Sequence, residues 1–538
     1  MAVIESQVDP RSETFARQRA AMLALVEEVR GLEQQVRDHS ARARSKFEQR
    51  GQLLPRERLL RLLDRGAPWL ELCSLAGLGM HEDEGAQGAG GCGGYAGVGF
   101  VSGVRCLVSA NDSGIKGGTV TPMGLKKSLR LQQIALENRL PTVSLIESGG
   151  ANLLHQAELF VDGGRVFCNM ARLSAAGIPQ VVVVHGSSTA GGAYIPGLAD
   201  YVVMVRDRAR VFLAGPPLVK AAIGQDADEE ELGGALMHAT TSGTAEYLAD
   251  DDAHGVQLAR ELVGALGWQR EELRPPCAPR PPRHDPDQLC GVVPPDPKVP
   301  YDVREVIARV VDGSELLEFK AGYGEETVCG HAAIEGWPVG VLGNNGPIVP
   351  QGSVKAAQFI QLCCQAGIPL VYLQNTTGYM VGREAEQAGA VKHGAKMIQA
   401  VANATVPQLT VVIGGGYGAG NYGMCGRSYD PRFIFAWPNS RVAVMGGEQV
   451  AQVMKIVTRQ KLARAGQEAD EAALDAMSAV LREQLERESR ALFATARVWD
   501  DGIIDPRETR RVLGFCLRTC AEAARRQLSP NTFGVARG

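Results

Sequence analysis

Two glycine-rich turns in this chain could stabilise negative charge, because each follows an apolar run and precedes residues that can start a helix. The small residues at their tips are Gly191 and Gly192 in the first half and Ala419 and Gly420 in the second. Small side chains let a carbonyl oxygen approach free backbone N–H groups and the positive end of a helix dipole. The pattern therefore predicts two oxyanion-binding turns. Tight packing of a strand on a helix also selects glycine, so either turn alone leaves both interpretations open.

Each apolar run and its turn are repeated at a constant interval along the chain. The matching positions are Pro141 and Pro369, Pro179 and Pro407, Gly186 and Gly414, and Tyr194 and Tyr422. Such regular repetition predicts one fold that has been duplicated, and it favours the functional interpretation of the paired turns. The runs have the length and β-branched content of buried parallel strands, and they alternate with helical segments. We therefore expect α/β layers with right-handed crossovers in each half.

The length of the chain favours two domains, because 538 residues are too many for one hydrophobic core. Ten prolines lie between Pro275 and Pro300, and proline interrupts both helices and central strands. This segment is the predicted linker, so we expect domains at residues 1–290 and 291–538. A strand hairpin is expected at Gly97 to Asp112, before the first copy of the repeat.

Composition argues against several classes of partner. The net charge is -4, with basic residues spread along the chain, so nucleic acid and anionic membranes are not expected as partners. No apolar run is long enough to cross a membrane, and the first residues resemble neither a signal peptide nor a transit peptide, which favours a cytoplasmic location. The cysteines contain no C-x-x-C pair, so we expect reduced thiols and no bound metal. His185 is expected in the core, because no carboxylate near it in sequence could orient it.

At these turns the chain resembles the carboxyltransferase (β) subunits of biotin-dependent acyl-CoA carboxylases. That family has an α/β fold of the crotonase type (the ClpP/crotonase spiral), duplicated in tandem. The resemblance extends to about residue 505, over LLPRERLLRLLDRG, SGGANL, GSSTAGGAYIPGLAD, FLAGPPLVKAAIG, GNNGPIVPQGSVKAAQFI and GGGYGAGNYGMCGR. The strings SGGANL, AGPPLVKAA and GGAYIP are typical of the branch that acts on methylcrotonyl-CoA and geranyl-CoA.

The resemblance implies a separate role for each turn. Acyl-CoA would lie against the first half, with its thioester oxygen at Gly191 and Gly192, and the ureido oxygen of biotin would lie at Ala419 and Gly420. Further implied contacts are Gly149, Gly150, Gly163, Gly164, Arg165 and Lys116 for the substrate, and Tyr417 and Gly418 for the cofactor. The implied reaction moves CO₂ from carboxybiotin to the γ carbon of the acyl-CoA, and the ureido anion acts as the base.

The resemblance also implies partner subunits. These are a biotin carboxylase/biotin carrier α subunit, which carries the carboxybiotin, and a homohexameric core of this chain in an α6β6 complex. The residues agree with this division of labour. The stretch from Gly118 to Ser128 lacks the spacing of an ATP-binding loop, and Lys396 lacks the preceding Met of biotin acceptors. Lys116, Lys126 and Lys127 could contact the phosphates of CoA, although a solvated helix face explains the last two equally well.

One segment departs from the family pattern. The string ELFVDGGRVFCNM, Glu158 to Met170, is shorter than the loop of methylcrotonyl-CoA enzymes and has Gly163 where they have a Phe that closes the acyl pocket. The departure is either a neutral change in a loop or the mark of a deeper pocket. We favour the deeper pocket, which predicts geranyl-CoA as substrate and leaves methylcrotonyl-CoA as the alternative.

Two other activities occur on this fold. A crotonase-type hydratase or isomerase needs acidic side chains at one site, and Glu147 is the one acid directly beside the first turn, with Asn375 at the matching position. A biotin-linked decarboxylase subunit of a sodium pump shares the duplicated fold.

Overall fold

The computed structural model describes residues 2–80, 90–268, 273–297 and 299–537. The chain forms two compact units, each built around an eight-stranded sheet. The first-sheet unit comprises Gly31–Leu273, Ala496–Val498 and Ala521–Gly538. The second-sheet unit comprises Met1–Arg30, Arg274–Thr495 and Trp499–Cys520. Because the units are not continuous in sequence, residues 1–290 and 291–538 remain our proposal for the limits of the duplicated segments.

The first sheet combines an antiparallel edge with a parallel core. Its strand order is β2-β3-β4-β5-β6-β7-β9, and β8, which is not part of this order, pairs with the last residues of β6. The strands from β2 to β4 pair antiparallel and those from β4 to β9 pair parallel. Their bounds are β2 Leu70–Glu71, β3 Gly94–Val101, β4 Val104–Asn111, β5 Thr142–Ser148, β6 Gln180–Thr189, β7 Tyr201–Val205, β8 Arg210–Phe212 and β9 Tyr247–Ala249. The hairpin predicted at Gly97 to Asp112 is confirmed as β3 and β4.

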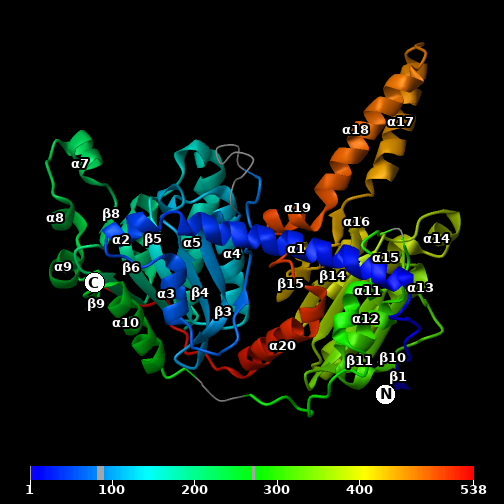
Figure 1. The fold of residues 1–538 in the computed structure, drawn as a ribbon, viewed down its shortest axis with the longest axis horizontal. Helices are drawn as coiled ribbons and strands as arrows, with labels where there is room; N and C mark the ends of the chain where they lie inside the picture. Colours follow the sequence, from blue (N-terminus) through cyan, green and yellow to red (C-terminus); the bar gives the residue numbers. More distant parts are fainter. Residues whose placement is uncertain (1, 81–89, 269–272, 298, 538) are drawn as a thin grey trace. The chain divides into compact units, whose positions relative to one another are not determined.

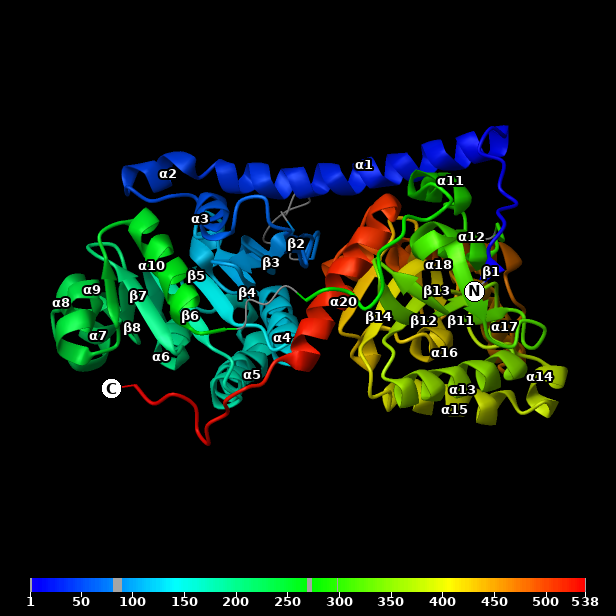
Figure 2. The ribbon, with the colours of Figure 1, turned by 90° about the horizontal axis from the view of Figure 1, so that it is seen from below.

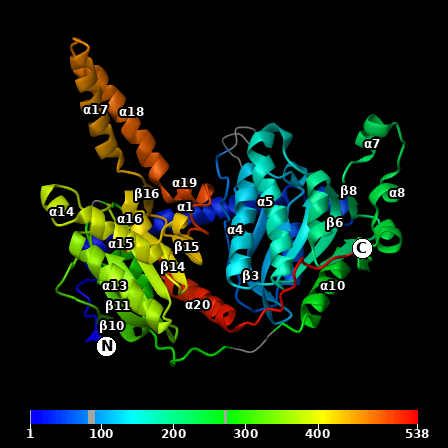
Figure 3. The same ribbon diagram turned by 180° about the vertical axis from the view of Figure 1, so that it is seen from behind.

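The helices of this unit cover its sheet in pairs. Helices α4 and α5 lie side by side (Figure 3), and α3 packs with α10 (Figure 2). Pro122 starts α4, and the side chain of Thr121 caps it by accepting the N–H of Gly124. The bounds are α2 Arg44–Gln49, α3 Pro55–Leu62, α4 Pro122–Glu137, α5 Gln156–Ala175, α6 Tyr194–Leu198, α7 Pro216–Ile223, α8 Glu229–Gly233, α9 Ala235–Met237 and α10 Asp252–Ala265.

The second sheet repeats this plan. Its order is β1-β10-β11-β12-β13-β14-β15, with β16 paired to β14 just as β8 is paired to β6. The bounds are β1 Ala2–Val3, β10 Glu315–Glu318, β11 Thr327–Ile334, β12 Trp337–Asn344, β13 Leu370–Thr376, β14 Gln408–Tyr417, β15 Phe433–Ala436 and β16 Arg441–Ala443. The duplication predicted from the sequence is therefore confirmed in the strand order.

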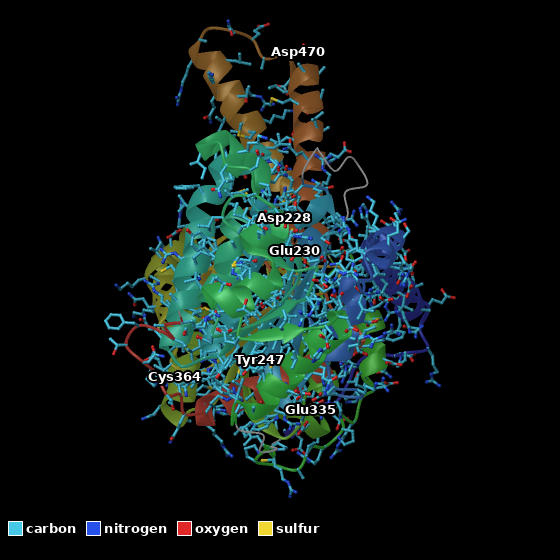
Figure 4. All side chains as sticks on the ribbon, turned by 90° about the vertical axis from the view of Figure 1, so that its left-hand side faces the viewer. Asp228, Glu230, Tyr247, Glu335, Cys364 and Asp470 are labelled. Atoms are coloured by element: carbon cyan, nitrogen blue, oxygen red, sulfur yellow. The ribbon has the colours of Figure 1, made fainter. Side chains whose placement is uncertain are left out.

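The remaining helices include a long hairpin. Helices α17 and α18 extend away from the sheet of their own unit (Figure 1), and Asp470, which caps α18, lies at the tip (Figure 4). The bounds are α1 Glu13–Ala41, α11 Leu289–Val292, α12 Val303–Val310, α13 Pro350–Ala366, α14 Arg383–Gln387, α15 Ala390–Ala402, α16 Gly418–Gly423, α17 Gly447–Arg464, α18 Glu471–Ser489, α19 Ala491–Ala496 and α20 Thr509–Arg525. The predicted linker lies within the second-sheet unit, which resumes at Arg274, and it contains α11, whose residues are all buried.

Candidate active site

The first predicted turn lies where β6 ends and α6 begins. A short 3-10 helix, Ala190–Ala193, connects the two, and Ala190 has a positive φ of 53°. Gly191 is exposed and Gly192 is buried. A Cβ atom on Gly192 would lie 3.0 Å from Oγ of Ser148, so a larger residue at this position would crowd Ser148. The carbonyl oxygen of Gly192 accepts a hydrogen bond of 2.9 Å from Ser188 Oγ. The hydrogen bond from Ser188 therefore fixes the buried side of the turn, while Gly191 is exposed to solvent.

The second turn repeats this arrangement at the end of β14. Tyr417 is the N-cap of α16, and Gly418 follows with a φ of 52°. Ala419 is exposed and Gly420 is buried. A Cβ on Gly420 would lie 2.8 Å from Cα of Gly378. The first N–H groups of a helix have no acceptor within the helix, so the small residues at this start can present donors to a ligand.

The same register shift occurs in both sheets beside the turns. The register of β5 against β6 shifts between Ile146 and Ser148, and that of β13 against β14 shifts between Gln374 and Thr376. Pairing resumes at Ser148 with Ser188 and at Thr376 with Gly416, so β6 and β14 each carry two extra residues just before the turn. Because both copies keep the shift, we interpret it as part of the site and not as a local defect.

The structure places Gly149 and Gly150 beside the first turn. Gly150 has a φ of 82°, and a Cβ there would lie 3.3 Å from the carbonyl oxygen of Thr189. A Cβ on Gly149 would lie 2.9 Å from the carbonyl oxygen of Gly117. Lys116, also expected near the substrate, directly precedes Gly117 and has a positive φ of 49°. Three of the predicted substrate contacts thus come together at the end of β5.

The segment from Glu158 to Met170 is not a loop. It lies entirely within α5, so the predicted loop is wrong, and Gly163, Gly164 and Arg165 are consecutive helical residues. Burial of the apolar face of this helix outweighs the cost of two interior glycines, about 1 kcal/mol each. Arg165 is exposed.

Phe167, which the sequence did not single out, joins α5 to the first turn. Its Cζ atom lies 3.8 Å from the Cβ position of Gly191, and its ring centroid lies 5.7 Å from that of Tyr194. Gly163 lies one helical turn before Phe167 on the same face. The nearest atom to a Cβ on Gly163 would be Leu125 Cδ1 at 4.0 Å. The helix therefore leaves open space next to the aromatic ring that borders the turn.

A buried network of charged side chains, which was not predicted from the sequence, lies at the end of β5 beside the first turn. Glu147, at the end of β5, accepts hydrogen bonds from Arg58 Nη1 at 2.9 Å and from Gln52 Nε2 at 2.7 Å. Arg58 Nε also donates to Asp252 Oδ2 at 2.8 Å, and Asp252 Oδ1 lies 2.9 Å from His185 Nδ1. The side chains of these four charged or titratable residues are no more than 4% exposed.

This network changes our interpretation of His185 and explains the position of Arg58. His185 is buried in the core as predicted, but it does have an orienting carboxylate, which comes from α10. A signal for Arg58 was present, because it shares the buried stripe of α3 with Leu59 and Leu62. A charged residue on such a stripe indicates a buried ion pair.

One of the lysines considered for the phosphates of CoA has a structural role instead. Lys127 is buried, and its Nζ donates to the carbonyl oxygens of Gly91 at 3.2 Å and Gly94 at 2.9 Å. It therefore belongs neither to a solvated helix face nor to a phosphate site. Lys396 lies in α15, within a helix as expected.

The described residues also bear on membrane-spanning helices and on clusters of possible metal ligands. Within the described ranges, no helix is long and apolar enough to cross a membrane. The same residues contain no group of three or more His, Cys, Asp or Glu side chains arranged to hold a metal ion.

Several known proteins are similar to this chain in sequence and in fold. The carboxyl transferase domain model matches residues 46–535. A probable mitochondrial methylcrotonoyl-CoA carboxylase beta chain of Drosophila melanogaster is 48% identical over 99% of this chain and 95% of its own. A biotin-dependent 3-methylcrotonyl-coenzyme A carboxylase beta1 subunit of Mycobacterium tuberculosis is 50% identical over 91% of this chain and 93% of its own.

A solved structure matches over the whole length. The beta subunit of geranyl-CoA carboxylase from P. aeruginosa has a TM-score of 0.94 and 60% identity, and the match covers 99% of this chain and 100% of that one. With the duplicated fold and the paired turns, these similarities show that the chain belongs to the carboxyl transferase family, as the carboxyltransferase component of a biotin-dependent acyl-CoA carboxylase.

Proposed function

We propose that this chain is the carboxyltransferase subunit of a geranyl-CoA carboxylase. The observation that carries the proposal is the open space at Gly163, one turn from the Phe167 ring that borders Gly191. A Phe at position 163 would fill this space, whereas glycine leaves room for a longer acyl chain. The P. aeruginosa protein, at 60% identity, is described as a geranyl-CoA carboxylase beta subunit, which supports the same substrate.

The two turns divide the reaction between them. The thioester oxygen of the acyl-CoA binds at Gly191 and Gly192, where backbone N–H groups stabilise the negative charge that develops when the γ carbon loses a proton. Each such donor contributes about 3 kcal/mol to its transition state. Gly149 and Gly150 shape the end of β5 beside this oxygen, and Lys116 together with Arg165 supplies positive charge for the CoA portion.

The second turn is suited to a flat cyclic urea. Its tip, at Ala419, is small and exposed, and Tyr417 and Gly418 directly precede it at the start of α16. When bound, carboxybiotin carried by the partner α subunit supplies the CO₂ and the base. The residues of this chain hold the ureido oxygen at Ala419 and Gly420, and the helix start favours its negative charge.

Methylcrotonyl-CoA is the second candidate substrate, because the relatives of 48% and 50% identity are described as methylcrotonyl-CoA enzymes. A hydratase or isomerase is disfavoured by the network around Glu147. Since this carboxylate is buried and paired with Arg58, it cannot exchange protons with a substrate. A sodium-pump decarboxylase subunit would not support carboxylation driven by ATP and bicarbonate with a soluble partner.

The assembly follows from the resemblance to the family. We propose a homohexameric core within an α6β6 complex, located in the bacterial cytoplasm, with a role in terpenoid catabolism. Purified alone, the chain should not fix bicarbonate with ATP, and streptavidin should detect no biotin on it. Biotin attached to Lys396 would contradict this division of labour.

The decisive experiment compares the two thioesters. The chain is reconstituted with its biotin-bearing partner, and kcat/KM is measured for geranyl-CoA and methylcrotonyl-CoA. Burying about five more carbons contributes up to ~4 kcal/mol at about 0.8 per CH₂, so geranyl-CoA should be preferred by at least tenfold. A preference for methylcrotonyl-CoA would replace the geranyl assignment by the methylcrotonyl one.

A further inference from the structure

Equivalent side chains stand beside the two turns, but one is a carboxylate and the other an amide. Glu147 in β5 and Asn375 in β13 each fill the space where a glycine of the neighbouring strand would carry its Cβ. Oε1 of Glu147 lies 2.1 Å from the Cβ position of Gly186, and Oδ1 of Asn375 lies 2.2 Å from that of Gly414. The two side chains therefore occupy equivalent places in the two copies, but Glu147 is a carboxylate and Asn375 is a neutral amide.

In the first copy the charge is neutralised locally. Arg58 binds Glu147 and Asp252 at once, and Ser113 Oγ donates a further hydrogen bond of 2.9 Å to Glu147. A buried carboxylate with such partners is stable, but removing its cation would leave an uncompensated charge. The first turn therefore tolerates a nearby carboxylate because Arg58 accompanies it.

In the second copy the hydrogen-bond partners of the equivalent side chain are neutral amide and backbone groups. Asn375 Oδ1 accepts the N–H of Gly415 at 3.0 Å, and the N–H of Asn375 donates to Asn344 Oδ1 at 3.4 Å. Asn421 Nδ2 donates to Gln374 Oε1, also at 3.4 Å. Across the described residues, no hydrogen bond or ion pair connects these amides to a charged side chain. Arg441 in the neighbouring β16 pairs with Gly415 in the sheet, but its Nη1 donates to the carbonyl oxygen of Glu486. Among the described residues, Asn375 therefore has no cation as a hydrogen-bond partner, in contrast to Glu147.

We infer that Asn375 is a positioning residue for the second turn and that it must be uncharged for carboxyl transfer. The inference rests on the proposed function, in which an oxyanion develops at Ala419 and Gly420. Asn375 fixes Gly415, which lies on the strand that leads directly into this turn. A carboxylate at the same place would oppose the oxyanion, because like charges in a low dielectric repel strongly.

The test introduces the charge with little change of shape. Asn375→Asp keeps the size of the side chain, and its carboxylate can still accept the Gly415 N–H. In the reconstituted holoenzyme, kcat relative to wild type should fall at least about tenfold near pH 8. Burial beside neutral amides and a developing oxyanion should raise the pKa of the introduced carboxyl. The ratio should therefore recover as the pH falls towards about 5.5, because the protonated side chain is neutral like asparagine. The KM for acyl-CoA should remain unchanged.

Two further variants distinguish the effect of the added charge from the effect of losing the hydrogen bond to Gly415. Asn375→Ala loses the bond to Gly415 without adding charge, so its ratio to wild type should be lowered equally at every pH. Asn403→Asp makes the same chemical change beyond the end of α15, at an exposed residue, and should behave as wild type. Thermal melting and native mass identify any variant that fails to fold or assemble. In that case Asn344→Asp, which places the charge one strand away, must show the pH-dependent ratio.

The outcomes distinguish this inference from the proposed function. A holoenzyme that carboxylates neither thioester rejects the proposed function. An active holoenzyme in which Asn375→Asp has the same ratio to wild type at both pH values rejects only the inference. A pH-dependent ratio in Asn375→Ala would also overturn it, because that variant has no group to titrate.

Discussion

Nδ1 of His185 lies 2.9 Å from Oδ1 of Asp252, although the two residues are 67 positions apart in sequence. Burial, with the positive charge of Arg58, lowers the pKa of His185 below its ordinary value of 6.5. Burial opposes ionisation of Asp252, but the hydrogen bond with His185 and the charge of Arg58 outweigh it and hold the pKa of this carboxyl below its usual range. At neutral pH the folded protein therefore contains a neutral imidazole and an ionised carboxylate.

This pair makes stability depend on pH in one direction. Below pH 6.5 the unfolded chain protonates His185 while the folded chain does not, so the free energy of unfolding falls as the pH falls. The slope from one group is at most about 1.4 kcal/mol per pH unit. His185→Gln keeps a donor for Asp252 but does not titrate, so its denaturant midpoint should change less than that of wild type between about pH 7 and pH 5. Equal slopes in the two proteins would contradict the assignment.

Filling the space on α5 should change substrate preference. Gly163→Phe places a ring beside Phe167, and overpacking of this kind costs ~1–3 kcal/mol. We expect kcat/KM for geranyl-CoA to fall about tenfold or more, with a much smaller loss for methylcrotonyl-CoA. Gly31→Phe, at an exposed helical position in α1 with no atom within 4 Å of its Cβ, is the matched control. An unchanged ratio of the two substrates in Gly163→Phe would remove the structural basis for the geranyl assignment.

Bulk at the buried glycine of either turn should abolish most activity. Gly192→Val would press on Ser148, and Gly420→Val would press on Gly378, so both should displace the N–H groups of the turn. Turnover should fall about a hundredfold or more, the range for loss of one oxyanion donor. Gly197→Val, in α6 with no atom within 4 Å of its Cβ, should keep normal turnover. Near-normal rates in folded Gly192 and Gly420 variants would mean that these glycines serve packing only.

Lys127 and Lys355 occupy equivalent positions in the two copies of the repeat, but their substitution by Met should affect stability differently. Lys127 in α4 donates to two carbonyl oxygens, whereas the buried Nζ of Lys355 in α13 has no hydrogen-bond partner among the residues with described positions. Burial accordingly lowers the pKa of Lys355. Lys127→Met should cost ~2–4 kcal/mol of stability, and Lys355→Met should be neutral or stabilising. Denaturant unfolding of both variants checks this, and equal losses would show that the two sites are equivalent.

The sequence predicted what depends on local pattern and on repetition. The strands, the hairpin and the two turns were visible because apolar runs and glycines recur at fixed intervals. The helix at Gly163 was missed because the segment was interpreted as the counterpart of a loop in the family, while the contacts that stabilise α5 come from residues on other elements. The network around Glu147 was missed for a similar reason. Arg58 and Asp252 are 194 positions apart, and no periodicity connects them.

That long separation also bears on the order of events during folding. Arg58 can bind Glu147 and Asp252 together only after α3, β5 and α10 have reached their final places, so the contact closes a loop across most of the first-sheet unit. Contacts of such sequence separation form late, because the entropy of the intervening chain must be lost first. Helical signal should therefore return early during refolding, and the rigid end of β5, with the ability to bind thioester, should return only with the last cooperative step.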